Sequence, residues 1–307
     1  MVEPISPRGV FNLPLTSGRF VVDCRTPEEH AAGAIAGSVL LPPASGGEDL
    51  EARVIRMWGE VDADCGYDDM LSLFVYDEGD SSDQVATVVA RTVARCADLA
   101  AGRHRHPKRA RSVRVISGGA RAFRNKYPFL YGPALDIFGD QLPTEYASEL
   151  TEQLFMGGKG SCTDPRSVSD LGITHIVNAT VSEPCYFAEN IQHPMSPEPK
   201  PTSGVRAVLP IAYLRLAVVD DVGETRLPEA LAVAMEFIAK ALADPCARVL
   251  IHCNQGRSRS SAVAIAWLMK SSGMSYDAAL DMVRHRRHSL VQPNPTFESV
   301  LRQLQGP

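Results

Sequence analysis

The second half of the chain is organised around a short apolar segment that ends in a polar loop. Val249–Ile251, followed by His252, has the composition of a short buried strand. The apolar run Ala262–Met269 comes next and predicts a helix that begins at Ser260. The polar residues between these elements therefore connect the end of a buried strand to the N-terminus of a helix.

Further apolar segments predict the elements around this loop. Strands are expected at 152–157 and 173–180, and helices at 164–171, 227–243 and 275–287. Proline is frequent between His193 and Gly204, which predicts a surface excursion.

The first half alternates short strands with helical segments. Strands are expected at 20–25, 39–42, 73–77 and 112–117, and helices from Thr26 and over 83–100. Thr26 suits the N-cap position and Pro27 the first helical turn. This alternation predicts a parallel sheet that helices cover on both faces.

Gly132–Leu142 breaks both periodicities and is interpreted as a linker between domains. The fold class is thus α/β with two domains, one over 1–131 and one over 143–307. A length of 307 residues suits two domains that each bury a core.

Composition limits the classes of function. The chain is 45% hydrophobic and 22% charged, which is typical of soluble globular proteins, and its net charge of −5 argues against general nucleic-acid binding. The N-terminus has no secretory signal pattern, and no apolar stretch reaches the length of a membrane span. Seven cysteines without paired spacing predict free thiols in a reducing compartment, the cytoplasm and also the nucleus.

The loop between the strand and the helix has the chemistry of an anion site. Backbone N–H groups and the helix dipole favour negative charge there, and they lower the pKa of a thiol such as Cys253. Arg259 offers a planar fork that matches two phosphate oxygens. Gly256 allows a close backbone curl, while Ser258 and Ser260 are small hydrogen-bond donors. The pattern predicts a phosphate-binding loop with a built-in nucleophile.

Three other interpretations of Cys253 fit the sequence less well. A lone buried cysteine is usually an inert core thiol, but here a histidine, a glycine and an arginine accompany it. No second His/Cys pair has metal-ligand spacing nearby, so a metal site is not expected. His252 precedes Cys253 at a strand end and points to the opposite side, which argues against a cysteine protease.

These residues resemble the His-Cys-x5-Arg-Ser signature of the cysteine-dependent protein phosphatases, in their dual-specificity branch. The resemblance implies that Cys253 is the nucleophile and that Arg259 holds the phosphate. Ser260 would assist departure of the thiolate, and His252 would hold the cysteine from behind. The loop itself would comprise Asn254, Gln255, Gly256, Arg257 and Ser258. No cofactor and no metal are implied.

The same resemblance implies a general acid, because expulsion of an alkoxide or phenolate requires a proton donor. The family carries an aspartate seven positions after a tyrosine, and Tyr213 leads to Asp220, with Asp221 as a close rival. The family often has Ala where this chain has Gln255. Pro293, Asn294 and Phe297 match a closing pattern that is expected to pack against the loop.

The first domain resembles the rhodanese-like domains. Three segments carry the resemblance: Val22–Arg25 with Glu28–His30, then Gly33–Ser38, and finally Ser117–Phe123 with Tyr127–Pro128. Active members have a cysteine after the strand that ends here at Tyr76, but this chain has the acidic Asp77–Ser82. The domain is therefore expected to be catalytically silent, with Cys24 as a packed core thiol.

The domain order resembles that of the MAP kinase phosphatases, whose rhodanese-like domain docks a kinase through basic residues. The corresponding segment Glu48–Arg56 mixes two arginines with acidic residues and makes a weak patch. The denser basic run Arg103–Arg111 fits a solvated loop, and it also fits a docking site for an acidic partner or a nuclear import signal.

The expected partner is a phosphorylated protein, with a MAP kinase as one candidate, and neither nucleic acid nor membrane is expected. The oligomeric state does not follow from the sequence. Two other functions stay open. One is a phosphoprotein-binding scaffold, against which the intact Cys253 and Arg259 argue. The other is a phosphatase for a non-protein phosphate ester, although the loop lacks the paired lysines of the related lipid phosphatases.

Overall fold

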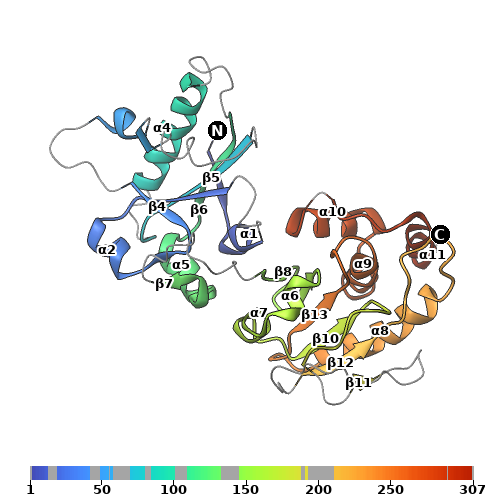
Figure 1. The fold of residues 1–307 in the computed structure, drawn as a ribbon. Helices are drawn as coiled ribbons and strands as arrows, with labels where there is room; N and C mark the ends of the chain where they lie inside the picture. The colour runs from blue at the N-terminus through green and yellow to red at the C-terminus, as the bar shows by residue number, and fades with distance from the viewer. Residues whose placement is uncertain are drawn as a thin grey trace. The chain divides into compact units, whose positions relative to one another are not determined.

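The computed structural model describes most of the chain, and it divides into two compact units, Met1–Pro143 and Thr144–Pro307 (Figure 1). The described residues are 2–12, 19–41, 49–54, 56–57, 70–79, 84–100, 109–132, 145–187, 191–192, 211–288 and 290–305. Most of the predicted linker, the proline-rich excursion and most of the basic run fall outside these ranges.

The first unit is built on a five-stranded sheet in which every neighbouring pair is parallel. In spatial order its strands are β1 (Glu3–Ile5), β6 (Arg109–Ile116), β5 (Met70–Tyr76), β2 (Arg19–Asp23) and β4 (Ser38–Leu40). The parallel sheet expected from the alternating pattern is confirmed. Strand β1 was not predicted, because three residues are too few to establish a periodicity.

The helices of the first unit follow their strands along the chain. Those with defined bounds are α1 (Pro7–Phe11), α2 (Pro27–Ala32), α4 (Gln84–Ala100) and α5 (Gly119–Lys126), residues 50–54 and 56–57 are also helical, and a short 3-10 turn, η1, covers Pro128–Leu130. Thr26 caps α2 as expected: its hydroxyl accepts the Glu29 N–H, and the Glu29 carboxylate accepts the Thr26 N–H.

One boundary of the predicted linker is wrong. Tyr131–Gly132 form strand β7, which pairs in antiparallel fashion with β3 (Ala34–Ile35). Gly132 therefore belongs to the fold of the first unit and not to the linker. A two-residue strand has no periodicity of its own, and its partner lies about a hundred positions earlier, so the local sequence gave no sign of the pairing.

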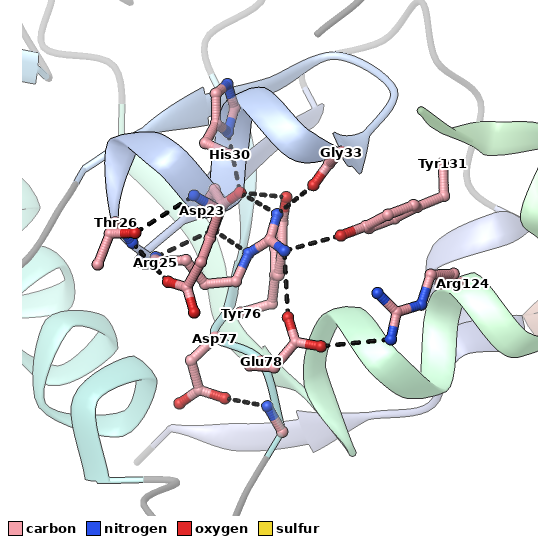
Figure 2. Close-up of polar contacts among 12 residues, drawn as sticks. Asp23, Arg25, Thr26, His30, Gly33, Tyr76, Asp77, Glu78, Arg124 and Tyr131 are labelled. Atoms are coloured by element: carbon pink, nitrogen blue, oxygen red, sulfur yellow. Dashed lines mark hydrogen bonds and ion pairs between the residues drawn. The ribbon is translucent and has the colours of Figure 1, made fainter. Parts of the chain in front are cut away.

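A buried polar network ties distant segments of the first unit together (Figure 2). Asp23 at the end of β2 is fully buried, and it accepts hydrogen bonds from Arg25 Nε at 2.9 Å and Tyr76 Oη at 2.8 Å. His30 Nδ1 lies 2.9 Å from the same carboxylate. Arg25 also donates to Tyr131 Oη at 2.7 Å and to Glu78 at 3.1 Å. Every charged group in this network is thus matched by partners.

The second unit has a six-stranded sheet, parallel except at one edge. In spatial order its strands are β11 (Ile191–Gln192), β12 (Ala212–Arg215), β10 (His175–Asn178), β13 (Val249–His252), β9 (Leu154–Gly157) and β8 (Ser148–Glu149). Its helices are α6 (Gly160–Thr163), α7 (Pro165–Asp170), α8 (Leu227–Leu242), α9 (Arg259–Ser272), α10 (Tyr276–Arg286) and α11 (Pro295–Leu304).

The central strand β13 positions the candidate site. All four of its residues are buried, and its neighbours β10 and β9 run parallel to it. Helix α9 follows with most of its residues in the same core, which explains why both segments are apolar. Ligands of open parallel sheets bind at the carboxyl ends of the strands, where the loop after β13 lies. Across the described residues, no helix is both long and apolar enough to cross a membrane.

Candidate active site

The loop after β13 curls tightly before α9 begins at Arg259. We call residues 253–259 the phosphate loop. Gly256 has a φ of +65°, and a Cβ at this position would lie 2.7 Å from the Gly157 carbonyl group. Glycine is therefore required both for the left-handed backbone and for the close approach to β9. This curl turns the loop amides inward.

Cys253 receives those inward donors. The side chain is buried, its Sγ accepts the Gly256 N–H at 3.2 Å, and Ser260 Oγ lies 3.2 Å away. Burial by itself acts to raise the pKa of this thiol. The Ser260 hydroxyl and the N–H groups of Ser260, Arg257 and Gly256 outweigh burial, so the pKa is lowered overall. The site thus favours a thiolate.

Arg259 is the first residue of α9. Its side chain is only 11% exposed, and its Nε has no hydrogen-bond partner among the described residues. Its Nε faces Asp220 Oδ2 at 3.6 Å, an ion pair that is longer than a hydrogen bond, so this buried donor remains available to an anionic ligand. With the inward amides and the helix N-terminus, Arg259 makes an arrangement of donors that suits an anion.

The outward carbonyls of the phosphate loop are held by Arg287, which follows α10. Its guanidinium donates from Nε to the Gly256 carbonyl at 2.9 Å and from Nη2 to the Gln255 carbonyl at 3.4 Å. Its Nη1 donates to the Met156 carbonyl at 3.2 Å. Arg287 has a structural role, because fixing the carbonyls outward keeps the amides inward.

The two rival aspartates point in different directions. Asp220 Oδ1 accepts hydrogen bonds from Ser258 Oγ at 2.7 Å and from Asn294 Nδ2 at 3.0 Å, while its Oδ2 lies 3.6 Å from Arg259 Nε. Asp221 instead accepts the Gly223 N–H at 2.7 Å within its own turn. Of the two carboxylates, only that of Asp220 is in contact with the phosphate loop.

Asn294 was recognised only as part of a packing segment, and its role is larger than that. Its N–H donates to Ser258 Oγ at 3.1 Å, its amide donates to Asp220, and its Oδ1 accepts the Phe297 N–H at 2.9 Å. One residue thus caps α11 and connects the phosphate loop to Asp220. The closing pattern of Pro293, Asn294 and Phe297 was its sequence signal, and asparagine is a residue type that favours the N-cap position.

His252 lies behind the cysteine and is completely buried. Its Nδ1 is 3.3 Å from the Sγ of Cys162, a residue of α6. Burial lowers the pKa of His252 to about 4, although its hydrogen bond with the Cys253 backbone acts in the opposite direction. The imidazole is therefore neutral at physiological pH and does not serve as a proton store for the site.

The remaining predicted loop residues lie at its rim. Asn254, Gln255 and Arg257 have exposed side chains, whereas their backbones are held. Lys159 N–H donates to the Asn254 carbonyl at 2.8 Å, and Gln292 N–H donates to the Arg257 carbonyl at 3.0 Å. The larger side chain of Gln255 therefore does not disturb the loop's anchoring. Within the described part of the chain, no three His, Cys, Asp or Glu residues are grouped as metal ligands.

Known proteins resemble the second unit most consistently. Residues 154–306 match the family model described as "Dual specificity phosphatase, catalytic domain". Dual specificity protein phosphatase 1B of Arabidopsis thaliana is 30% identical over 158 residues, which are 52% of this chain and 81% of that protein.

Two further relatives extend the comparison into the first unit. Dual specificity protein phosphatase 4 of Gallus gallus is 23% identical over 318 residues, covering 93% of this chain and 76% of that protein. Dual specificity protein phosphatase 8 of Mus musculus is 29% identical over 196 residues, covering 61% of this chain. The chain spans only 26% of the length of this mouse relative.

Proposed function

Because the chain belongs to the dual specificity phosphatase family, we propose that it hydrolyses phosphate monoesters on proteins through a phosphocysteine intermediate. One observation carries the proposal. The Cys253 thiol accepts donors from its own loop, and the carboxyl group of Asp220 lies against that loop, 3.6 Å from the Nε of Arg259, which has no hydrogen bond among the described residues. Nucleophile, oxyanion donor and acid are thus adjacent.

In the first step the Cys253 thiolate attacks phosphorus and the P–O ester bond breaks. Asp220, protonated, gives its proton to the departing oxygen, so the product leaves as a neutral hydroxyl. The loop amides and Arg259 stabilise the charge on the transferring phosphoryl group. The bonds of Asp220 to Ser258 and Asn294 hold the acid beside the loop before substrate arrives.

In the second step water attacks the phosphocysteine. Asp220, now ionised, takes a proton from that water, the S–P bond breaks and inorganic phosphate leaves. The sulfur departs as a thiolate, which the Ser260 hydroxyl and the Gly256 N–H stabilise. Asp220 ends the cycle protonated and Cys253 ionised, as both began.

The proposed substrates are phosphotyrosine together with phosphoserine and phosphothreonine, and a MAP kinase is the finer candidate. The short catalytic unit and the absence of a Trp-Pro-Asp loop from the sequence support a site that admits all three residues. We further propose that the first unit is a silent rhodanese-like domain. The alignment with the chicken relative, which covers 93% of this chain and 76% of that protein, supports that domain order. The cytoplasm, and also the nucleus, is the proposed location.

Turnover of a small aryl phosphate tests the proposal. Purified protein under reducing conditions is expected to hydrolyse para-nitrophenyl phosphate, and Cys253→Ser is expected to abolish turnover. Cys246→Ser, which changes an exposed free thiol, is the matched control and retains activity. Absence of turnover by the wild type would overturn the enzymatic proposal.

The physiological substrate requires a different experiment. Cys253→Ser retains the loop amides and Arg259 but lacks a nucleophile, so it should bind phosphoprotein without releasing it. Immobilised Cys253→Ser is expected to capture a phosphoprotein that free vanadate displaces. Capture of an active MAP kinase, lost after that kinase is dephosphorylated, would support the finer candidate. Capture of other phosphoproteins instead would contradict it.

A further inference from the structure

The segment that carries Asp220 is closed on itself by a second carboxylate. We call residues 219–226 the acid loop; it precedes α8. Glu224 lies within it, and its side chain is only 4% exposed although the residue is charged. A buried carboxylate in a surface loop requires several donors to offset its desolvation. Glu224 has them, and all of them come from the acid loop itself.

Four hydrogen bonds converge on the Glu224 carboxylate. Oε2 accepts the Val219 N–H at 2.8 Å and Arg226 Nη2 at 3.0 Å. Oε1 accepts the Arg226 N–H at 2.9 Å and Arg226 Nε at 3.1 Å. Val219 and Arg226 are the two ends of the acid loop. The carboxylate therefore joins both ends and fixes the width of the loop that presents Asp220.

The middle of the acid loop has its own anchors. The Glu224 N–H donates to the Asp221 carbonyl at 3.2 Å and closes a turn. Thr296 Oγ1 donates to the Val222 carbonyl at 2.6 Å, which ties the loop to the first turn of α11. Asp220 follows directly after Val219, whose N–H is bound to Glu224. A movement of this end would shift the Asp220 carboxyl group.

We propose that Glu224 is a positioning residue that holds Asp220 at the phosphate loop, so that the acid is in place before substrate binds. The proposal rests on the proposed phosphatase function and names a further residue on which that reaction depends. Glu224 does not contact the reacting atoms. It acts through the backbone at Val219 and through Asp220.

The Glu224 carboxylate stays charged throughout the pH range of catalysis. Burial acts to raise the pKa of Glu224, but the Arg226 side chain and the N–H groups of Val219 and Arg226 lower it to about 2. A carboxyl pKa lowered by folding stabilises the structure above its ordinary value of 4.5, and this contribution is lost only as the pH falls towards 2. Between pH 5 and 8, roughly, the Glu224 carboxylate therefore does not change its charge.

Replacing Glu224 with glutamine is expected to loosen the acid loop. The glutamine amide retains one acceptor oxygen, and its NH₂ group would face two of the four donors. Displacement of the general acid lowers turnover most when the leaving group is poor, because a good leaving group departs without a proton. Turnover of phenyl phosphate should fall roughly 10- to 100-fold, and that of dinitrophenyl phosphate less than about twofold.

The decisive test combines Glu224→Gln with Asp220→Asn in the full chain. If Glu224 acts through Asp220, then Glu224→Gln lowers phenyl phosphate turnover in the wild type but adds less than about twofold in the Asp220→Asn background. Glu229→Gln, which removes an exposed charge on α8, is the matched control and leaves turnover unchanged. Arg226→Ala supplies a milder variant, because its side chain is 44% exposed. If Glu224→Gln fails to fold, Arg226→Ala replaces it in the test, and it should also slow phenyl phosphate turnover more than dinitrophenyl phosphate turnover.

The outcomes separate this inference from the proposed function. Absence of turnover by the wild type would contradict the proposed phosphatase function itself. An active wild type in which Glu224→Gln or Arg226→Ala slows both substrates equally would overturn the positioning role. An equal loss from Glu224→Gln in the wild-type and Asp220→Asn backgrounds would overturn it as well. A loss confined to the poor leaving group, and absent without Asp220, would establish the role.

Discussion

Both units contain a parallel strand followed by a loop and a helix. A glycine N–H group in each loop donates a hydrogen bond, but the acceptors are of different kinds. After β5 in the first unit, Asp77 Oδ1 accepts the Gly79 N–H at 2.9 Å. After β13 in the second, the Gly256 N–H points at the Cys253 sulfur. The Gly79 N–H is thus bound by a carboxylate of its own loop, whereas the Gly256 N–H is directed to a nucleophile.

The arginines differ in the same way. Arg25 in the first unit donates to Asp23, Glu78, Tyr131 and the Gly33 carbonyl, so its guanidinium is matched within the protein (Figure 2). Arg259 in the second unit keeps a buried Nε without a hydrogen-bond partner among the described residues. An anion site therefore needs more than a buried arginine near a strand end. It needs a donor that makes no hydrogen bond, as Arg259 Nε makes none among the described residues, although Asp220 Oδ2 forms a longer ion pair with it at 3.6 Å.

Two cysteines at strand ends show the electrostatic result. Cys24 follows β2 and Cys253 follows β13, and both are almost fully buried. Burial raises the pKa of Cys24, and the nearby carboxylates of Asp23 and Asp77 raise it further. The pKa of Cys253 is lowered, because burial is outweighed by the Ser260 hydroxyl and loop amides. Equal burial thus leads to opposite chemistry.

Among variants that keep Cys253, the largest loss is expected from Arg259→Lys, which retains the charge but removes the planar guanidinium group. Loss of one preorganised oxyanion donor costs on the order of 10²- to 10³-fold in turnover, so activity should fall by about that factor. Arg257→Lys is the matched control on the exposed rim and should change turnover little. Steady-state kinetics on para-nitrophenyl phosphate measures both. Equal effects at the two positions would contradict the account of an unmatched Arg259.

Asp220→Asn ranks next and compares two neighbouring carboxylates. Turnover of phenyl phosphate should fall roughly 100-fold, because the leaving oxygen loses its proton donor. Asp221→Asn should have little effect, since that side chain is bound within its own turn. A loss confined to Asp221→Asn would show that the acid is misassigned.

Ser260→Ala is expected to have a smaller effect, directed at the thiolate. Removing the hydroxyl at 3.2 Å from the sulfur weakens a hydrogen bond to a charged group, which is worth about tenfold. The pKa of Cys253 should rise, so the acid limb of the pH–rate profile should shift to higher pH. Ser261→Ala is the control, because its hydroxyl donates to the Arg257 and Ser258 carbonyls instead. An unshifted acid limb in Ser260→Ala would contradict the assignment.

Asp23→Asn should leave turnover within about twofold while destabilising the first unit. It removes the buried counter-charge of Arg25, which keeps only the ion pair with the partly exposed Glu78 at 3.1 Å, and loss of a buried ion-pair partner costs about 3–5 kcal/mol of unfolding free energy. The pKa of Asp23 is lowered in the fold: burial opposes this, but Arg25 and His30 dominate. Its contribution is therefore present above pH 3.8 and lost as the pH falls further.

Chemical denaturation at neutral and at acid pH measures this contribution. Glu28→Gln, an exposed charge on α2, is the control and should leave unfolding unchanged. Asp23→Asn should unfold at a lower denaturant concentration than the wild type at neutral pH, and the difference should shrink as the pH falls. Equal stability of Asp23→Asn and the wild type at neutral pH would contradict the role given to the network.

The sequence predicted the centre of the site because its parts are close in the chain. Cys253, Arg259 and Ser260 lie within one strand–loop–helix segment, whose periodicities are read directly. The supporting residues were predicted less well. Asn294 reaches Asp220 across 74 positions, and Arg287 reaches Gly256 across 31. Contacts between such distant positions depend on the fold, and a local pattern does not encode them.

The longer elements of the fold were predicted for the same reason, and the shortest were not. Strand β5 and helix α4 are long enough to show their periods. Strands β3 and β7 have two residues each, and their pairing corrected the start of the linker. Glu224 gave no signal either, since an acidic residue in a polar loop is ordinary until its burial is seen.

The pH dependence of cysteine alkylation tests the central comparison most directly. Iodoacetate is a small anion, and peptide mass spectrometry follows its reaction at each cysteine separately. Cys253 should be alkylated in its thiolate form at a pH well below the ordinary thiol pKa of about 8.5, with inorganic phosphate protecting it, while Cys24 stays unmodified. Alkylation of Cys253 only above that pH, or at the same rate as Cys24, would contradict the account.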